Sequence, residues 1–265
     1  MSIIHPTSVV DKSAEIGEGV QIGPFCVVGP NVKIGDNTVL HSHVSVAGYT
    51  TIGVGNEIFP YASIGHKPQD LKFNNELSYL EIGDHNRIRE AVTINPGTEG
   101  GGGLTRVGNN CLFMIGTHIA HDCLIEDNVV MANYSTLGGH VEVANNVIFG
   151  GHSAIHQFCK AGKYSFIGAG SMVTGNVIPF GTVLGDRAIL SGLNLVGLKR
   201  ANFKREDIHD LRNAYKLIQS SSDADFFTAR VQQAEEQFGG TPLVDDLINF
   251  IKSIDKRGIC LPQQN

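Results

Sequence analysis

The residues best suited to chemistry in this sequence are histidines that recur at nearly regular intervals. His121, His140 and His156 follow one another along the chain at similar spacings. Asp122 follows His121 directly. Imidazole accepts a proton readily near pH 7, and a neighbouring carboxylate can fix its tautomer and raise its basicity. A fold that returned to the same place after each such interval would gather these side chains into a general-base site.

Such a fold is indicated by an apolar residue at every sixth position. The pattern runs unbroken over Ile4–Ile64, resumes over Ile82–Ile94, and continues one residue out of phase over Val107–Val173. A period of six fits neither an amphipathic helix nor a single alternating strand, and it is the signature of a hexapeptide-repeat parallel β-helix. Three hexads would close one triangular coil, which gives roughly nine coils. Coils of this kind are left-handed, an exception to the usual right-handed crossover. Glycine often follows the apolar residue, as expected where the backbone turns tightly and φ can be positive.

The repeat places the histidines at one corner of the predicted prism. Counted in steps of three hexads, His121, Gly139 and Gln157 have the same register, and strands of successive coils lie about 5 Å apart. His118 lies on the same coil as His121. Solvated corner histidines would also fit this pattern. A zinc site between subunits, as in γ-class carbonic anhydrases, is a further alternative. A purely structural β-helix would need a flat, repetitive threonine face, which is absent.

Two segments interrupt the repeat. The first is HKPQDLKFNNELSY, from His66 to Tyr79, and it carries Asp70 and Lys72 together with a second lysine. The second is NPGTEGGGGLT, residues 95–105, where the phase shifts by one residue. Long ordered loops on a rigid scaffold often carry function. We therefore expect a functional role for the first segment, whereas the second is either functional or a harmless insertion.

The sequence predicts two domains, a β-helix over residues 1–190 and a helical domain over residues 191–265. Three C-terminal helices are expected from apolar spacing: one over 208–218, one over 226–238 and one that starts at Thr241-Pro242. Asp223 is a candidate N-cap of the second helix, and Gly239-Gly240 would end it. Gly258 would end the third. The fold class is thus all-β with a C-terminal helical domain.

Composition excludes several classes of protein. The chain has 265 residues, a net charge of −6 and a pI near 6.0, which argues against a nucleic-acid binder. There is no apolar run of membrane-spanning length and no signal-peptide pattern at the start, so we expect a cytoplasmic protein without an integral membrane segment. The five cysteines are odd in number, and four occupy the small fifth position of a hexad. We expect the cysteines to be small core residues in a reducing compartment, and neither disulfides nor nucleophiles.

Specific motifs are spread along the chain: HIAHDC (118–123), QDLK (69–72), IRE (88–90), GGGGLT (100–105), HQFC (156–159), GLKR (197–200) and RNAYKLI (212–218). Together they resemble the UDP-N-acetylglucosamine O-acyltransferase family. The resemblance covers essentially the whole chain and is weakest after Ser220.

The resemblance implies an acyl transfer in the first step of lipid A biosynthesis. An (R)-3-hydroxyacyl chain would pass from acyl carrier protein to the glucosamine 3-hydroxyl of UDP-N-acetylglucosamine. The family is homotrimeric, with active sites between subunits. No metal, cofactor or covalent acyl-enzyme is expected, because the carrier-protein thioester is already activated.

Residue roles follow from the same resemblance. His121 would be the general base, Asp122 its support, and the Gly139 N–H the oxyanion donor. Ala169 matches a position that limits acyl-chain length. The residues implied to hold the sugar, diphosphate, pantetheine and nucleotide are Asp70, Lys72, His118, His140, His156, Gln157, Asn194 and Arg200.

Some features leave alternatives open. Ala201 stands where some members have a second basic residue, so the diphosphate contacts can differ here. The related N-acyltransferase carries an extra N-terminal domain, for which a repeat beginning at Ile4 leaves no room. A coenzyme A-dependent acetyltransferase, a metal-dependent hydratase and a non-catalytic scaffold are the other rivals. The sequence does not specify the acyl length, or whether the acceptor is UDP-N-acetylglucosamine or its 3-amino analogue.

Overall fold

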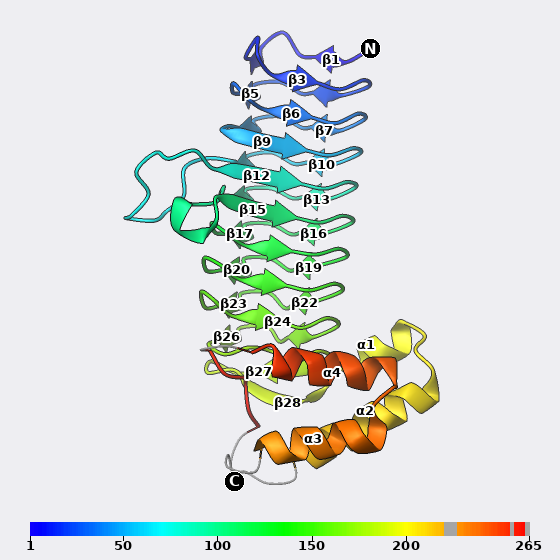
Figure 1. Ribbon diagram of the computed structural model, residues 1–265. Coiled ribbons are helices and arrows are strands. Elements are labelled where there is room, and N and C mark those ends of the chain that lie inside the picture. Colours follow the sequence, from blue (N-terminus) through cyan, green and yellow to red (C-terminus); the bar gives the residue numbers. More distant parts are fainter. Residues whose placement is uncertain (220–226, 255–256, 263–265) are drawn as a thin grey trace.

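The computed structural model describes residues 1–219, 227–254 and 257–262 (Figure 1). These residues form a left-handed parallel β-helix with α-helices at its C-terminal end. The predicted fold class is therefore confirmed. Each coil contributes one short strand to each of three sheets, which we call A, B and C.

Sheet A is the longest of the three. It contains β1 (Ile3–Ile4), β4 (Gln21–Ile22), β7 (Val39–Leu40), β10 (Glu57–Ile58), β13 (Arg87–Ile88), β16 (Leu112–Phe113), β19 (Val130–Met131), β22 (Ile148–Phe149), β25 (Phe166–Ile167), β27 (Gly181–Leu184) and β28 (Ile189–Leu193). All of its pairs are parallel except the terminal hairpin of β27 and β28.

Sheets B and C complete the prism. Sheet B contains β2 (Val9–Val10), β5 (Val27–Val28), β8 (Ser45–Val46), β11 (Ser63–Ile64), β14 (Thr93–Ile94), β17 (His118–Ile119), β20 (Thr136–Leu137), β23 (Ala154–Ile155) and β26 (Met172–Val173). Sheet C contains β3 (Glu15–Ile16), β6 (Lys33–Ile34), β9 (Tyr49–Ile52), β12 (Tyr79–Ile82), β15 (Leu104–Val107), β18 (Leu124–Ile125), β21 (Glu142–Val143) and β24 (Lys160–Ala161).

The repeated apolar residues point inward and stack coil upon coil. Ile58, Ile64 and Ile88 are fully buried, and each pairs with its counterpart in the neighbouring coil. Burying one such side chain contributes about 1.5–3 kcal/mol. The hexad period thus specifies the core directly, because every sixth residue faces the axis of the prism.

Gly65, which follows the inward Ile64, has the expected positive φ (73°), but most glycines in this position have another cause. Gly35 does not have a positive φ, but a Cβ placed on it would lie 2.6 Å from the carbonyl carbon of Gly53 in the next coil. The positive φ occurs two residues later, at Asn37 (56°) and Gly55 (65°). The expectation of positive φ was wrong at Gly35, where close approach of successive coils excludes a side chain.

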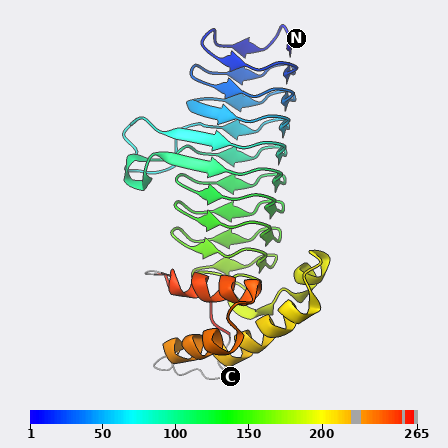
Figure 2. The ribbon, with the colours of Figure 1, turned by 45° about the vertical axis from the view of Figure 1, so that its right-hand side comes forward.

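Both interruptions of the repeat leave the corner between sheets B and C, the B–C corner. The first loop, residues 65–78, connects β11 to β12, and the second loop, residues 95–103, connects β14 to β15. Ile58 therefore pairs with Ile88. Ile88 pairs with Phe113, which accounts for the phase shift of one residue. Figures 1 and 2 show the two loops side by side on one edge of the prism.

In the described part of the chain, four helices cover the C-terminal end of the prism: α1 (Leu195–Arg200), α2 (Arg205–Ile218), α3 (Phe227–Phe238) and α4 (Pro242–Lys252). The three predicted helices are present, and α3 ends directly before Gly239. The predicted end of the third helix at Gly258 was wrong, because α4 already ends at Lys252, where Ser253 caps it. The candidate cap Asp223 lies outside the described residues. The predicted domain boundary at residue 190 falls inside β28. Among the residues that the structure describes, no helix combines the length and apolarity needed to cross a membrane.

Candidate active site

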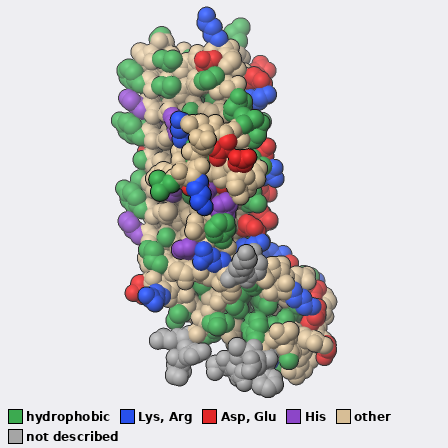
Figure 3. Space-filling view, turned by 60° about the vertical axis from the view of Figure 1, so that its left-hand side comes forward, with side chains coloured by type: hydrophobic (Ala, Val, Ile, Leu, Met, Phe, Trp, Pro, Cys, Tyr) green, Lys and Arg blue, Asp and Glu red, His purple; other side chains and the backbone are tan. Residues whose placement is uncertain are grey.

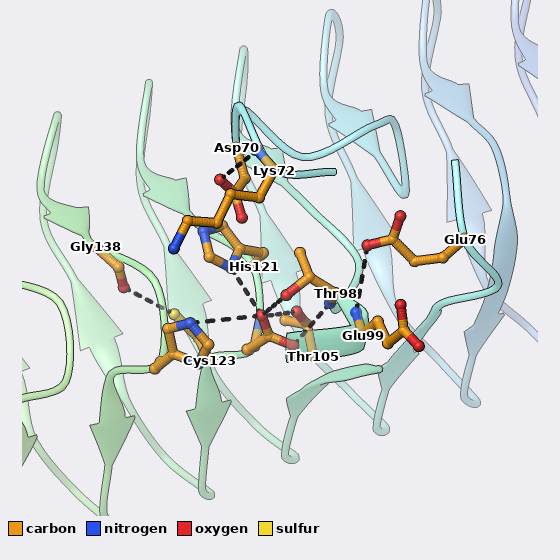
Figure 4. Close-up of polar contacts among 11 residues, drawn as sticks. Asp70, Lys72, Glu76, Thr98, Glu99, Thr105, His121, Cys123 and Gly138 are labelled. Carbon is orange, nitrogen blue, oxygen red and sulfur yellow. Dashed lines mark hydrogen bonds and ion pairs between the residues drawn. The ribbon is translucent and has the colours of Figure 1, made fainter. Parts of the chain in front are cut away.

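The predicted histidine cluster assembles at the B–C corner, beside the two loops (Figure 4). His121 Nδ1 lies 2.7 Å from Asp122 Oδ2. His140, one coil later, places its Nε2 3.8 Å from the same oxygen. The two imidazole rings meet edge to face with their centroids 5.1 Å apart. The register predicted for these coils is confirmed, because β17 pairs with β20 and β20 with β23, each three hexads further along the chain.

Asp122 is almost completely removed from solvent, with 1% of its side chain exposed. Thr98 of the second loop donates to both carboxylate oxygens, from its backbone N–H to Oδ1 at 2.8 Å and from its hydroxyl to Oδ2 at 2.6 Å. The Asp122 N–H donates to Thr105 Oγ1 at 2.7 Å. Sequence reasoning missed both threonines. The only available signal was that the second loop departs from the repeat one coil before His121.

The hydrogen bond to Asp122 fixes the tautomer of His121. An ionised carboxylate can only accept, so Nδ1 carries the proton and Nε2 is the basic nitrogen. Among the hydrogen bonds of the described residues, none involves this Nε2. The His121 side chain is 14% exposed. This is the arrangement that a general base requires.

Gly139 lies directly against the His121 ring. A Cβ on Gly139 would come within 2.6 Å of His121 Cε1 and 2.7 Å of Nε2. The Gly139 carbonyl accepts from the Phe158 N–H, whereas its own N–H has no partner among the described residues. A free backbone donor beside the basic nitrogen is suited to binding developing negative charge.

The neighbouring histidines are poor proton acceptors. Burial lowers the pKa of His118, and the adjacent His121 lowers it further. Burial is also the main cause that lowers the pKa of His140, although the Asp122 charge opposes it. Both rings are therefore neutral at pH 7 and suited to hydrogen bonding. His118 Nδ1 already lies 2.7 Å from Thr93 Oγ1.

The first loop brings opposite charges to the same corner. Asp70 Oδ1 accepts from the Lys72 N–H at 3.0 Å. The Lys72 side chain is exposed, and Figure 4 shows it with Asp70 on the loop beside His121. The charge of Asp70 also acts to raise the pKa of His140. Figure 3 shows basic, acidic and histidine side chains gathered on this face of the prism.

His156 and Gln157 lie exposed at the B–C corner one coil beyond His140. His156 Nδ1 lies 3.2 Å from the Gln157 carbonyl oxygen. The adjacent Phe158, which the sequence did not single out, stacks on the His140 ring with centroids 4.4 Å apart. The predicted residues of this coil thus extend the site along the corner.

Three predicted residues lie at other corners of the same chain. Ala169 is exposed between β25 and β26, at the corner between sheets A and B. Asn194 caps α1 by accepting from the Gly197 N–H, and its Nδ2 donates to the carbonyl of Tyr164 between β24 and β25. Arg200 is exposed at the end of α1. One chain therefore does not bring these residues to His121.

The cysteine beside this cluster is not a nucleophile. Burial raises the pKa of Cys123 to about 12, so its thiol stays protonated at neutral pH. All five cysteines are buried and free. Their predicted position in the core is confirmed.

The cluster also contains three groups that metals bind. Ligand atoms of His121, Asp122 and His140 all lie within 4.8 Å of one another. However, Asp122 Oδ2 already accepts from both the His121 Nδ1–H and the Thr98 hydroxyl. This pattern orients a base without further ligands, and we favour it over a metal site.

Family models match both parts of the chain. The bacterial transferase hexapeptide model, with six repeats, matches residues 13–48 and 104–139. The model described as UDP N-acetylglucosamine O-acyltransferase, domain 2, matches residues 176–260.

Similar proteins carry a consistent name. The chain is 43% identical over 260 residues to acyl-[acyl-carrier-protein]–UDP-N-acetylglucosamine O-acyltransferase of Bartonella henselae, which covers 98% of this chain and 94% of the relative. The enzyme of that name from Rickettsia bellii is 47% identical, with 98% and 92% covered. The crystal structure of UDP-N-acetylglucosamine O-acyltransferase from Moraxella catarrhalis superposes with a TM-score of 0.93 at 43% identity, over 97% of this chain and 99% of that one. The chain therefore belongs to the UDP-N-acetylglucosamine O-acyltransferase family of hexapeptide-repeat acyltransferases.

Proposed function

We propose that the chain transfers an (R)-3-hydroxyacyl group from acyl carrier protein to the glucosamine 3-hydroxyl of UDP-N-acetylglucosamine, the first step of lipid A biosynthesis. The observation that carries this proposal is the His121 imidazole, which is held by Asp122 through Nδ1. Its Nε2 and the adjacent Gly139 N–H have no hydrogen-bond partner among the residues that the structure describes. Family membership supports the substrates, and the site supports the mechanism. We place the reaction in the cytoplasm.

The reaction proceeds by direct attack. His121 Nε2 takes the proton of the 3-hydroxyl as its oxygen attacks the thioester carbonyl carbon, and the Gly139 N–H stabilises the resulting oxyanion. Collapse of this intermediate forms the ester and breaks the C–S bond. The departing pantetheine thiolate recovers the proton from the His121 imidazolium. No acyl-enzyme is needed, because the thioester donor is already activated, and the Cys123 thiol beside the site is buried and protonated.

The substrates would lie along the B–C corner. Neutral His118 and His140 suit hydroxyl and amide groups, whereas exposed Lys72 suits phosphate. Asp70, His156 and Gln157 would provide further contacts with the sugar, diphosphate and pantetheine. The protein supplies no cofactor in this scheme, since the activated group arrives on acyl carrier protein.

A homotrimer would complete the site. Ala169 lies at the corner between sheets A and B, whereas His121 lies at the B–C corner. Asn194 is hydrogen-bonded to Tyr164 at the remaining corner, between sheets C and A. If Ala169, Asn194 and Arg200 act on the same substrates as His121, neighbouring copies must place their corners beside the B–C corner. The separation of these residues within one chain supports a site between subunits.

The proposed function is tested by assaying a panel of acyl thioesters with two acceptors, UDP-N-acetylglucosamine and its 3-amino analogue. We expect acyl transfer from 3-hydroxyacyl carrier-protein thioesters to UDP-N-acetylglucosamine. Mass spectrometry identifies the product. A strong preference for the 3-amino analogue would change the acceptor. Transfer from coenzyme A thioesters but from no carrier-protein thioester would contradict the assigned donor.

Removal of metal is expected to leave turnover unchanged. Attack on a thioester needs a base and an oxyanion donor, and His121 and the Gly139 N–H supply both. The measurement is kcat after exhaustive dialysis against a chelator, with metal content determined on the same sample. Activity that disappears after this treatment and returns with Zn²⁺ would contradict this prediction. It would favour a metal site formed by His121, Asp122 and His140.

Substitutions at Ala169 are expected to change the preferred acyl length. A larger side chain would shorten the space for the chain, and each CH₂ that stays buried contributes about 0.8 kcal/mol. Ala169→Met should favour shorter donors, and Ala169→Gly equal or longer ones, when kcat/KM is compared across the donor panel. The same donor ranking in both variants would mean that the acyl chain ends elsewhere.

A further inference from the structure

We propose that the second loop is a clamp for Asp122 and that Thr98 is a positioning residue of the reaction. The clamp consists of Thr98 and Gly101 of the second loop, together with Thr105 of β15, the strand that follows the loop. These residues surround the carboxylate of Asp122 and its backbone. This inference rests on the proposed function, because it assumes that Asp122 acts through His121. It assigns a role to a loop for which the sequence left a functional segment and a harmless insertion both open.

Thr98 determines how the carboxylate is presented to the imidazole. Its N–H binds Oδ1 at 2.8 Å, and its hydroxyl binds Oδ2 at 2.6 Å. Two donors from one residue fix both the plane and the rotation of the carboxylate. Oδ2 is also the oxygen that accepts from His121 Nδ1. Hydrogen bonds to an ionised group in a buried site are stronger than neutral ones, so this orientation is firmly held.

Gly101 closes the clamp from the other side. The position of a Cβ on Gly101 is already occupied by the carboxylate of Asp122. Gly100, its neighbour in the same 3₁₀ turn (Glu99–Gly101), has no atom within 4 Å of its Cβ position. The glycine run thus contains one position where contact with Asp122 excludes a side chain and an adjacent one where it does not.

Backbone hydrogen bonds hold the second loop to Tyr79 of β12 and to the first loop. The Tyr79 N–H donates to the Gly103 carbonyl at 2.8 Å, and the Gly97 N–H donates to the Tyr79 carbonyl at 3.1 Å. Glu76 of the first loop accepts from the Glu99 N–H at 3.3 Å. Figure 4 shows Glu76 in contact with Glu99, next to Thr98. Thr98 is therefore held by the fold, which a positioning residue requires.

The test compares Thr98→Val and Thr98→Ser in the wild-type protein and in Asp122→Asn. Valine keeps the shape but removes the hydroxyl, and we expect kcat to fall about 10–100-fold with KM little changed, by analogy with partners that orient metal-binding histidines. Serine restores the donor and should recover most of the loss. In Asp122→Asn, Thr98→Val should cause little additional loss, because the two residues act as one unit.

Two outcomes would overturn the inference. If kcat of Thr98→Ser were as low as that of Thr98→Val, the hydroxyl group would not be the feature that turnover requires. An equal fold-loss from Thr98→Val with and without Asp122 would show a general structural role. Urea unfolding of each variant is measured alongside, and a Thr98→Val protein that loses activity only by unfolding would likewise overturn it.

The adjacent glycines provide a matched second test. Gly101→Ala should lower kcat, since its methyl group displaces the Asp122 carboxylate, whereas Gly100→Ala should stay near wild type. Equal effects of the two variants would argue against the clamp. Turnover retained in His121→Ala would remove the proposed function itself. Turnover lost in His121→Ala but unchanged in Thr98→Val and Gly101→Ala would remove only the clamp.

Discussion

Replacing His121 with alanine is expected to lower kcat by about 10²–10⁴-fold, the usual contribution of a general base. The variant removes the only histidine nitrogen that is both oriented by a buried carboxylate and free of a hydrogen-bond partner among the described residues. Neither His118 nor His140 can substitute, because burial lowers the pKa of each and neither has an equivalent carboxylate bond. The measurement is kcat with both substrates saturating.

The fold of His121→Ala should survive, because the ring lies at a corner outside the stack of inward residues. Thermal unfolding checks this point. His5→Ala is the matched control, since His5 is an exposed histidine of the first coil whose imidazole bonds, among the described residues, only to Thr7. It should retain wild-type turnover. More than about a tenth of wild-type kcat in His121→Ala would exclude the assignment of the base, given the size of the usual effect.

The β-helix could be predicted because its rule is local and repeated. Each hexad places one apolar residue inward, so a period of six encodes both the strand and the corner, and register follows by counting. That is why His121 and Gly139 could be aligned from the sequence alone. The same counting predicted that Cys123 and its counterparts face the core.

The contacts of Asp122 could not be predicted, since they come from a segment outside the repeat. No periodicity fixes the path of residues 95–103, so the two hydrogen bonds from Thr98 appear only in three dimensions. Asn194 shows the same limit. Its capping of α1 depends on a hairpin of β27 and β28 that the fading repeat did not predict.

The separation of Ala169 from His121 could have been deduced from the hexad frame. Each corner of a coil recurs after three hexads, and these two residues belong to different corners. Counting therefore shows that a site containing both requires a second chain. The hexad register does not predict how neighbouring chains pack together, because the outward-facing side chains follow no comparable repeat.

Replacing Gly139 with alanine is expected to reduce kcat by about 10²–10³-fold, as when an oxyanion donor is lost. The added Cβ would lie 2.6 Å from His121 Cε1, so either the imidazole or the backbone must move. Both movements separate the base from the donor. KM should change less than kcat, because the interaction is stronger in the transition state than with bound substrate.

Gly29→Ala is the matched control for this prediction. Gly29 lies at the same B–C corner in the N-terminal coils, and a Cβ there meets its nearest neighbour at 3.4 Å, an ordinary contact. It should keep wild-type kcat and a similar unfolding transition. If Gly139→Ala retained wild-type kcat, the close approach of the His121 ring to the Gly139 backbone would not be required for turnover. If kcat fell while His121 stayed in place in a crystal structure of the variant, the loss would belong to the backbone donor alone.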